Sequence, residues 1–170
     1  VIEYARNVAG IVAASSEGFN ANQEQAVINI MESQKNVDKK GASMRLGAYP
    51  CVLKDGTFAR KIYGQDKVNE RHRHRFEVNN KFRDKLEKAG LVLSGTSPNN
   101  ELVEMIELRD HPWFIGVQFH PEFKSTPRKP HPLFKSFISA ALVQRDSRNK
   151  NPEKNRDNDT REHALSTKIN

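Results

Sequence analysis

A histidine and a glutamate separated by one proline, at His120-Pro121-Glu122, form the group in this chain best suited to chemistry. Proline fixes its own φ and favours an extended conformation for the residue before it, so it limits where both polar side chains can point. A histidine that is oriented by a carboxylate, which also stabilises its imidazolium, supplies two of the three members of a nucleophilic triad.

The residues before this pair predict where it lies in the fold. The run from Trp113 to Val117 is almost continuously apolar, a pattern typical of a strand covered on both faces, as in a parallel sheet. Open α/β sheets place their active sites where the chain leaves the carboxyl end of such a strand. The alternative is a solvated His-Pro turn after a core strand, and the residues alone leave it open.

A second unusual segment, residues 71–79, alternates arginine with histidine or phenylalanine. On a strand, Arg71, Arg73 and Arg75 would share one face, opposite His72, His74 and Phe76. Three arginines on one face could clamp a carboxylate or follow the phosphates of RNA, or they could simply be solvated. These three interpretations stay open.

Cys51 is the only cysteine, so an internal disulfide is excluded and a reducing, cytoplasmic environment is indicated. It lies inside a strand pattern rather than on a sharp strand-to-helix turn, which predicts a buried structural residue rather than a nucleophile. Residues 41–47 predict a turn without the spacing of a phosphate-binding loop. No zinc-type spacing of cysteine and histidine occurs, so we expect no metal site.

The chain has 170 residues and a formal net charge of +7, enough for one domain or for a piece of a larger one. No apolar run approaches the length of a membrane span, and the first residues do not form a signal peptide. The positive charge suggests anionic metabolites or nucleic acid as partners, or simply a basic surface.

The periodicity predicts an α/β fold. Helices are expected over residues 1–9, after Asn79-Asn80 as far as Gly90, and from Pro132, the last burying Phe134, Phe137, Ile138, Ala141 and Leu142. Strands are expected at 26–31, 71–78, 91–95 and 102–108, with two more between 44 and 63 joined by a turn at 54–57. Residues 32–40 form a charged connection. The folded domain should span residues 1–145, and the polar residues 146–170 should form a disordered tail.

Three segments together resemble one family. They are MRLG at 44–47, ERHRHRFEVN at 70–79 and HPWFIGVQFHPEF at 111–123, continued by STPRKPHPLF at 125–134. They resemble the C-terminal part of the class I glutamine amidotransferase (glutaminase) domain of CTP synthases. GVQFHPE alone would indicate any class I glutamine amidotransferase, whereas the other two segments restrict the resemblance to CTP synthases.

The resemblance implies a role for each matching residue. His120 would be the general base that activates a cysteine thiol, Glu122 the carboxylate that orients it, and Arg75 the arginine that holds substrate glutamine. The nucleophile elbow with the catalytic cysteine would precede Val1, so the 170 residues alone should be inactive. A family glutamate that binds the amino group of glutamine falls at Gly18 in an ungapped count, with Glu17 one residue early.

The implied function is release of ammonia from L-glutamine for the ATP-dependent amination of UTP to CTP, in a cytoplasmic homotetramer. No cofactor is expected in this part; ATP and Mg²⁺ would belong to an N-terminal synthetase domain, and neither a membrane nor nucleic acid is an expected partner. Two alternatives remain: a non-catalytic basic binding module derived from a glutaminase domain, and another class I amidotransferase.

Overall fold

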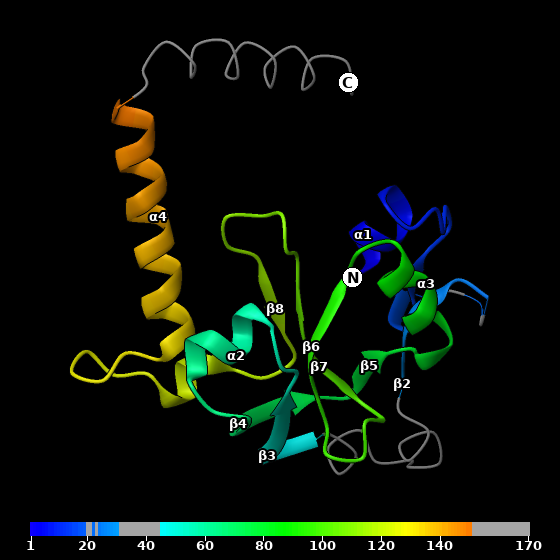
Figure 1. Ribbon diagram of the computed structural model, residues 1–170. Helices are drawn as coiled ribbons and strands as arrows, with labels where there is room; N and C mark the ends of the chain where they lie inside the picture. The colour runs from blue at the N-terminus through cyan, green and yellow to red at the C-terminus, as the bar shows by residue number, and fades with distance from the viewer. Residues whose placement is uncertain (20–21, 23, 31–44, 151–170) are drawn as a thin grey trace. The chain divides into compact units, whose positions relative to one another are not determined.

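The computed structural model describes residues 1–19, 22, 24–30 and 45–150, which form helices and two sheets (Figure 1). The larger sheet has five strands in the order β4-β3-β6-β7-β8, and every neighbouring pair is antiparallel. Its strands are β3 (Arg45–Leu53), β4 (Lys67–His74), β6 (Val92–Thr96), β7 (Val103–Glu107) and β8 (Ile115–Val117). The smaller sheet, in the order β1-β2-β5, pairs β1 with β2 in parallel and β2 with β5 antiparallel. Its strands are β1 (Ser15–Ser16), β2 (Ala26–Ile30) and β5 (Phe76–Val78).

Four α-helices and three described 3₁₀ turns connect the strands. The helices are α1 (Ile2–Asn7), α2 (Phe58–Tyr63), α3 (Arg83–Lys88) and α4 (Pro132–Lys150), and the 3₁₀ turns are η1 (Glu17–Phe19), η3 (Asn80–Phe82) and η4 (Pro121–Lys124). Across the described ranges, none of these helices combines the length and apolar character that crossing a bilayer would require.

Two apolar clusters hold the first compact unit, Val1–Leu133, together. One lies among α1, α3 and strands of both sheets and includes Ala5, Val27, Leu86, Leu91 and Val103. The other lies on the larger sheet and includes Cys51, Leu53, Val68, Met105 and Phe119. Cys51 is 0% exposed, so the prediction of a buried structural cysteine is confirmed.

Several predicted elements are observed, and the helix after Asn79 shows why. The Asn79 side chain accepts a hydrogen bond from the backbone N–H of Lys81 at 3.1 Å, which caps the start of η3. Leu86 is fully buried on the inner face of α3. Gly90 follows with φ +101°, a conformation that favours glycine, and ends the helix. The predicted helix at the start of the chain and the strand beginning at Ala26 are also present.

The second strand expected between residues 44 and 63 is wrong, because residues 58–63 form helix α2. The Thr57 hydroxyl accepts from the Arg60 N–H at 3.2 Å, and Gly64 ends the helix at φ 65°. The buried Glu107 carboxylate accepts from the N–H groups of Phe58 and Ala59 at 2.8 and 3.0 Å. Caps and a tertiary carboxylate therefore decide the structure of a segment whose residue types do not.

The strand before His120 was expected to be covered on both faces, as in a parallel sheet, and this prediction is also wrong. Only Ile115–Val117 is a strand, it is half-buried, and among the described strands it pairs with β7 alone, in antiparallel. Gly116 permits β8 to lie close to β7, since a Cβ at this position would lie 2.9 Å from the Ile106 side chain. β8 is thus an edge strand of the described sheet, not a central parallel one.

The predicted strand 71–78 is divided at Arg75: β4 belongs to the larger sheet and β5 to the smaller. Residues 45–47 also differ from the expected turn over 41–47, because they already belong to β3. Residues 31–44 and 151–170 lie outside the described residues, and with them the expected connection 32–40 and most of the expected tail.

Helix α4 begins at Pro132 as predicted but extends to Lys150, past the expected boundary at residue 145. From Phe134 to Lys150 the helix belongs to a second compact unit. The burial predicted for its apolar side chains is not found in that unit, where Phe137 and Ile138 are 49% and 56% exposed.

We predict that Glu107→Ala destabilises the domain, because it leaves the N–H groups of Phe58 and Ala59, in the first turn of α2, without their acceptor. The expected loss is about 2 kcal/mol, which corresponds to a fall in Tm of roughly 6 °C for a domain of this size. Glu87→Ala is the control, since the Glu87 side chain makes an exposed ion pair with Lys54 at 3.6 Å. Thermal unfolding followed by circular dichroism measures both, and equal Tm values for the two variants would contradict the capping role of Glu107.

Candidate functional site

The structure brings His120 and Glu122 together just beyond the carboxyl end of β8. His120 Nδ1 lies 2.7 Å from Glu122 Oε1, and the two side chains are 38% and 55% exposed. His120 is extended, at φ −110° and ψ 91°, and Pro121 begins η4. The restraint that proline imposes therefore produces the predicted contact, at a position that a substrate can reach.

Electrostatics and packing both fix the orientation of this pair. The hydrogen bond with His120 holds the pKa of the Glu122 carboxyl below its usual range. The His120 ring stacks on Phe123, with ring centroids 5.1 Å apart. With Nδ1 directed at the carboxylate, Nε2 is the nitrogen available to take a proton from a nucleophile.

The three arginines of the 71–75 segment occupy different positions. Arg71 and Arg73 lie on the exposed face of β4. Arg75 is half-buried and lies at the bend where the chain passes from β4 to β5. The predicted alternation holds within β4, but Arg75 does not continue the row of exposed arginines.

The turn at Glu17-Gly18 lies close to the start of β5, directly after Arg75. Glu17 Oε2 accepts a hydrogen bond from the Ile30 N–H at 2.8 Å. A Cβ on Gly18 would lie 3.0 Å from the Phe76 ring, next in the chain to Arg75. In this structure the Glu17 carboxylate is thus engaged by the backbone at the end of β2.

The environment of Cys51 is unsuited to nucleophilic chemistry. Burial, reinforced by the charges of Glu104 and Glu70, raises the pKa of the Cys51 thiol to about 12. Since the thiolate is the nucleophilic form, Cys51 is inert at neutral pH.

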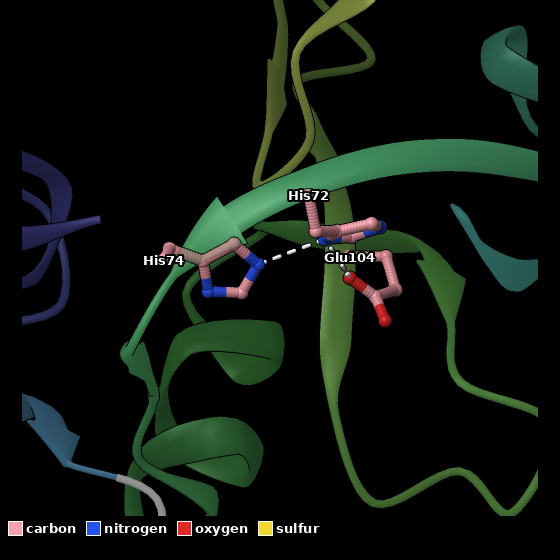
Figure 2. A group of neighbouring side chains, drawn as sticks. All are labelled: His72, His74 and Glu104. Carbon is pink, nitrogen blue, oxygen red and sulfur yellow. Dashed lines mark hydrogen bonds and ion pairs between the residues drawn. The ribbon is translucent and has the colours of Figure 1, made fainter. Parts of the chain in front are cut away.

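A buried polar network, which the sequence analysis missed, lies behind the His120 loop. Arg45 Nη1 lies 2.6 Å from Glu104 Oε1 and 3.7 Å from Glu77 Oε1. The two inward histidines of β4 join this group (Figure 2): His72 Nδ1 lies 2.8 Å from His74 Nε2 and 3.7 Å from Glu104 Oε2. His74 Nδ1 in turn lies 3.3 Å from Glu77 Oε1. We refer to Arg45, His72, His74, Glu77 and Glu104 as the buried network.

Burial determines the charge states in this network. It lowers the pKa of His72 to about 3 and that of His74 to about 4, with the Arg45 charge as the second cause, so both rings are neutral at neutral pH. It raises the pKa of Glu77 to about 8, reinforced by the charge of Glu104. Arg45 is consequently the one member with a permanent positive charge.

His72, His74 and Glu104 also have the geometry of a possible metal site, because their ligand atoms lie within 4.8 Å of one another. The Arg45 guanidinium, however, already pairs with Glu104 and would repel a cation beside it. The two imidazoles share one hydrogen bond, between His72 Nδ1 and His74 Nε2, while His72 Nε2 and both Glu104 oxygens have no hydrogen-bond partner among the described residues. Because the Arg45 charge occupies the cluster, we interpret it as a network of buried ion pairs and assign no metal to it.

A buried carboxylate on β4, that of Glu70, anchors the chain that follows the site. Glu70 Oε1 accepts from the Tyr63 hydroxyl at 3.1 Å and lies 3.0 Å from His131 Nε2. Lys124, at the end of η4, places its Nζ 3.7 Å from Glu70 Oε2. The inward face of β4 thus contacts the chain on both sides of His120 and Glu122.

Comparison with known proteins agrees with this geometry. Residues 1–140 match the family model of class I glutamine amidotransferases, and the chain belongs to that family. Its curated relatives include CTP synthases: the protein from Pelobacter propionicus is 57% identical over 148 residues, and that from Geobacter sulfurreducens 55%. The match covers 87% of this chain and 28% of each relative.

A solved structure supports the same conclusion. The glutaminase domain of Trypanosoma brucei CTP synthase, solved with bound acivicin, superposes with a TM-score of 0.77 at 42% identity. The match covers 84% of this chain and 56% of the solved one. The α/β fold predicted from the sequence and the resemblance to the CTP synthase glutaminase domain are therefore confirmed.

We predict that His120→Ala raises the pKa of the Glu122 carboxyl toward its ordinary value of 4.5, because it removes the hydrogen bond that stabilises the carboxylate. The stabilisation that this contact gives the native state is present above pH 4.5 and is lost as the pH falls through the lowered pKa of Glu122. A ¹³C NMR titration of the carboxyl carbon measures the shift. His111→Ala removes an exposed histidine elsewhere and should leave the Glu122 titration unchanged; an unchanged titration in His120→Ala would show that the contact does not persist in solution.

Proposed function

We propose that this chain forms part of the glutaminase of a CTP synthase and helps to release ammonia from L-glutamine. The observation that carries the proposal is the oriented His120–Glu122 pair, 2.7 Å apart, in a chain whose curated relatives include CTP synthases. The ammonia would serve the ATP-dependent amination of UTP to CTP. ATP and Mg²⁺ would be bound by a synthetase domain of the same protein, which acts as a cytoplasmic homotetramer.

In the proposed reaction His120 moves two protons. Its Nε2 takes the proton of a cysteine thiol, and the thiolate attacks the carboxamide carbon of glutamine. The imidazolium then gives that proton to the leaving ammonia, and the resulting thioester is hydrolysed by water with His120 again as base. Glu122 holds the ring and stabilises its charged form.

The thiol in this proposal belongs to a cysteine outside the 170 residues. Cys51, the sole cysteine here, is 0% exposed and has its thiol pKa raised to about 12. His120 and Glu122 would therefore complete a Cys-His-Glu triad with a residue that precedes Val1, and this chain by itself would not turn over glutamine.

Arg75 is proposed to bind the α-carboxylate of glutamine. A planar guanidinium suits a carboxylate, and Arg75 differs from Arg71 and Arg73 in being half-buried at a bend between two sheets. The neighbouring turn offers Glu17 for the amino group of the substrate, provided that its contact with Ile30 is exchanged for the ligand.

The main test of the proposed function uses the full-length protein and two nitrogen sources. His120→Ala should lower glutamine-dependent CTP formation by about 10³-fold or more, while synthesis from added ammonia is retained, because the triad only generates ammonia. His111→Ala is the control and should retain both activities. Equal loss with glutamine and with ammonia would contradict the glutaminase role of His120, and full retention of both would favour a non-catalytic module.

The role of Arg75 is tested by Arg75→Lys. We expect the KM for glutamine to rise about tenfold, the loss of one charge-assisted hydrogen bond, with kcat changed much less, because a ground-state clamp is removed. Arg73→Lys on the exposed face of β4 is the matched control and should leave KM unchanged. Equal kinetic effects at both positions would indicate a general electrostatic patch instead.

A further inference from the structure

The loop that carries His120 is attached to the β4–β5 segment by three successive residues. Gln118 Nε2 donates to Glu77 Oε2 at 3.1 Å. The Phe119 ring meets the His72 ring edge-on, with centroids 5.8 Å apart. The His120 N–H donates to the Arg71 carbonyl at 2.8 Å. The position of the His120 backbone therefore depends on the interior of the sheet as well as on Pro121.

Of these three contacts, the one between Glu77 and Gln118 joins the His120 loop to the charges of the buried network. Glu77 is 2% exposed. While one of its oxygens accepts from Gln118, the other faces His74 Nδ1 at 3.3 Å and Arg45 Nη1 at 3.7 Å. Glu77 Oε1 makes these two contacts at ion-pair distance, without a hydrogen bond. Because the buried carboxyl group is surrounded by three side chains, it has little room to move and restrains the Gln118 side chain.

The backbone of Gln118 is held as well, because its N–H donates to the Glu104 carbonyl at 3.0 Å. Gln118 is therefore fixed at both its backbone and its side chain, two residues before His120. Glu77 in turn lies two residues after Arg75. The buried carboxyl of Glu77 thus connects the segment of Arg75, the proposed substrate clamp, with the loop of His120, the proposed base.

We propose that Glu77 is a positioning residue for His120, and that it acts through the side chain of Gln118. It touches neither substrate nor the reacting atoms. Its effect is to keep the imidazole where it can reach both the thiol and Glu122, since small misplacements of a catalytic group are costly. The kinetic part of the test rests on the proposed glutaminase function, and the spectroscopic part does not.

The kinetic test is a double-mutant cycle in the full-length protein with Glu77→Ala, Gln118→Ala and the double variant. Each single change should lower kcat for glutamine hydrolysis roughly 10–100-fold, leave the KM for glutamine within about twofold and spare ammonia-dependent synthesis. The double variant should be no worse than either single one, because both remove the same contact. Glu77→Gln keeps an oxygen that can accept from Gln118 and should restore most of kcat.

Glu107→Ala is the control for a merely structural role. Glu107 is also a buried carboxyl, 3% exposed, but it caps α2 instead of contacting the His120 loop. It should lower Tm while leaving kcat of the folded protein unchanged. Additive losses in the double variant, or an equal fall of kcat in Glu107→Ala, would overturn the proposal.

A readout independent of activity uses the 170-residue chain and the ¹³C titration of Glu122. Loss of the Glu77–Gln118 contact should loosen the His120–Glu122 hydrogen bond and raise the Glu122 pKa toward 4.5. Gln118→Ala leaves the ion pairs of Arg45 in place, so it tests the contact even where Glu77→Ala lowers stability. An unchanged Glu122 titration in Gln118→Ala would overturn the positioning role, whatever the activity of the full-length protein.

Discussion

The ion pair between Arg45 and Glu104 is the constraint on which the rest of the site depends. Its side chains are 6% and 0% exposed, so neither charge is solvated and each requires the other. Three strands of the larger sheet and β5 of the smaller sheet contribute side chains around this pair. Arg45 therefore links the two sheets by electrostatics, because it pairs with Glu104 of the larger sheet and lies 3.7 Å from Glu77 of the smaller one. An apolar contact would leave the relative register of the sheets less defined.

The His120–Glu122 pair could be predicted from sequence because its geometry is local: a proline between the two residues restricts both. Arg75 could be selected among three arginines only by resemblance, since its distinction is a bend between two sheets that strand periodicity does not show. Helix α2 escaped prediction because its N-terminus is held by Glu107, 48 and 49 residues away.

The network residues escaped prediction for a related reason. Glu104 lies in a strand whose five residues are all buried, whereas a glutamate between apolar residues normally indicates a solvent-facing position. Arg45 and Glu77 were each attached to a recognisable motif, but their pairing depends on tertiary structure. The available signal was an arginine at the start of a strand, together with glutamates in otherwise apolar strands. The need to balance charge within a core could have linked them.

The two glutamates of β7 have a further consequence, which concerns how the sheet assembles. Glu104 has its partner on β3, and Glu107 has its partners at the start of α2. If β7 paired with β6 one or two residues out of step, both carboxylates would be buried away from these partners, at a cost of several kcal/mol. Apolar residues alone would tolerate such a slip far better, because neighbouring valine, methionine and isoleucine side chains are nearly interchangeable. Glu104 and Glu107 thus make misaligned sheets energetically unfavourable during folding, so that the chain reaches a single alignment of its strands.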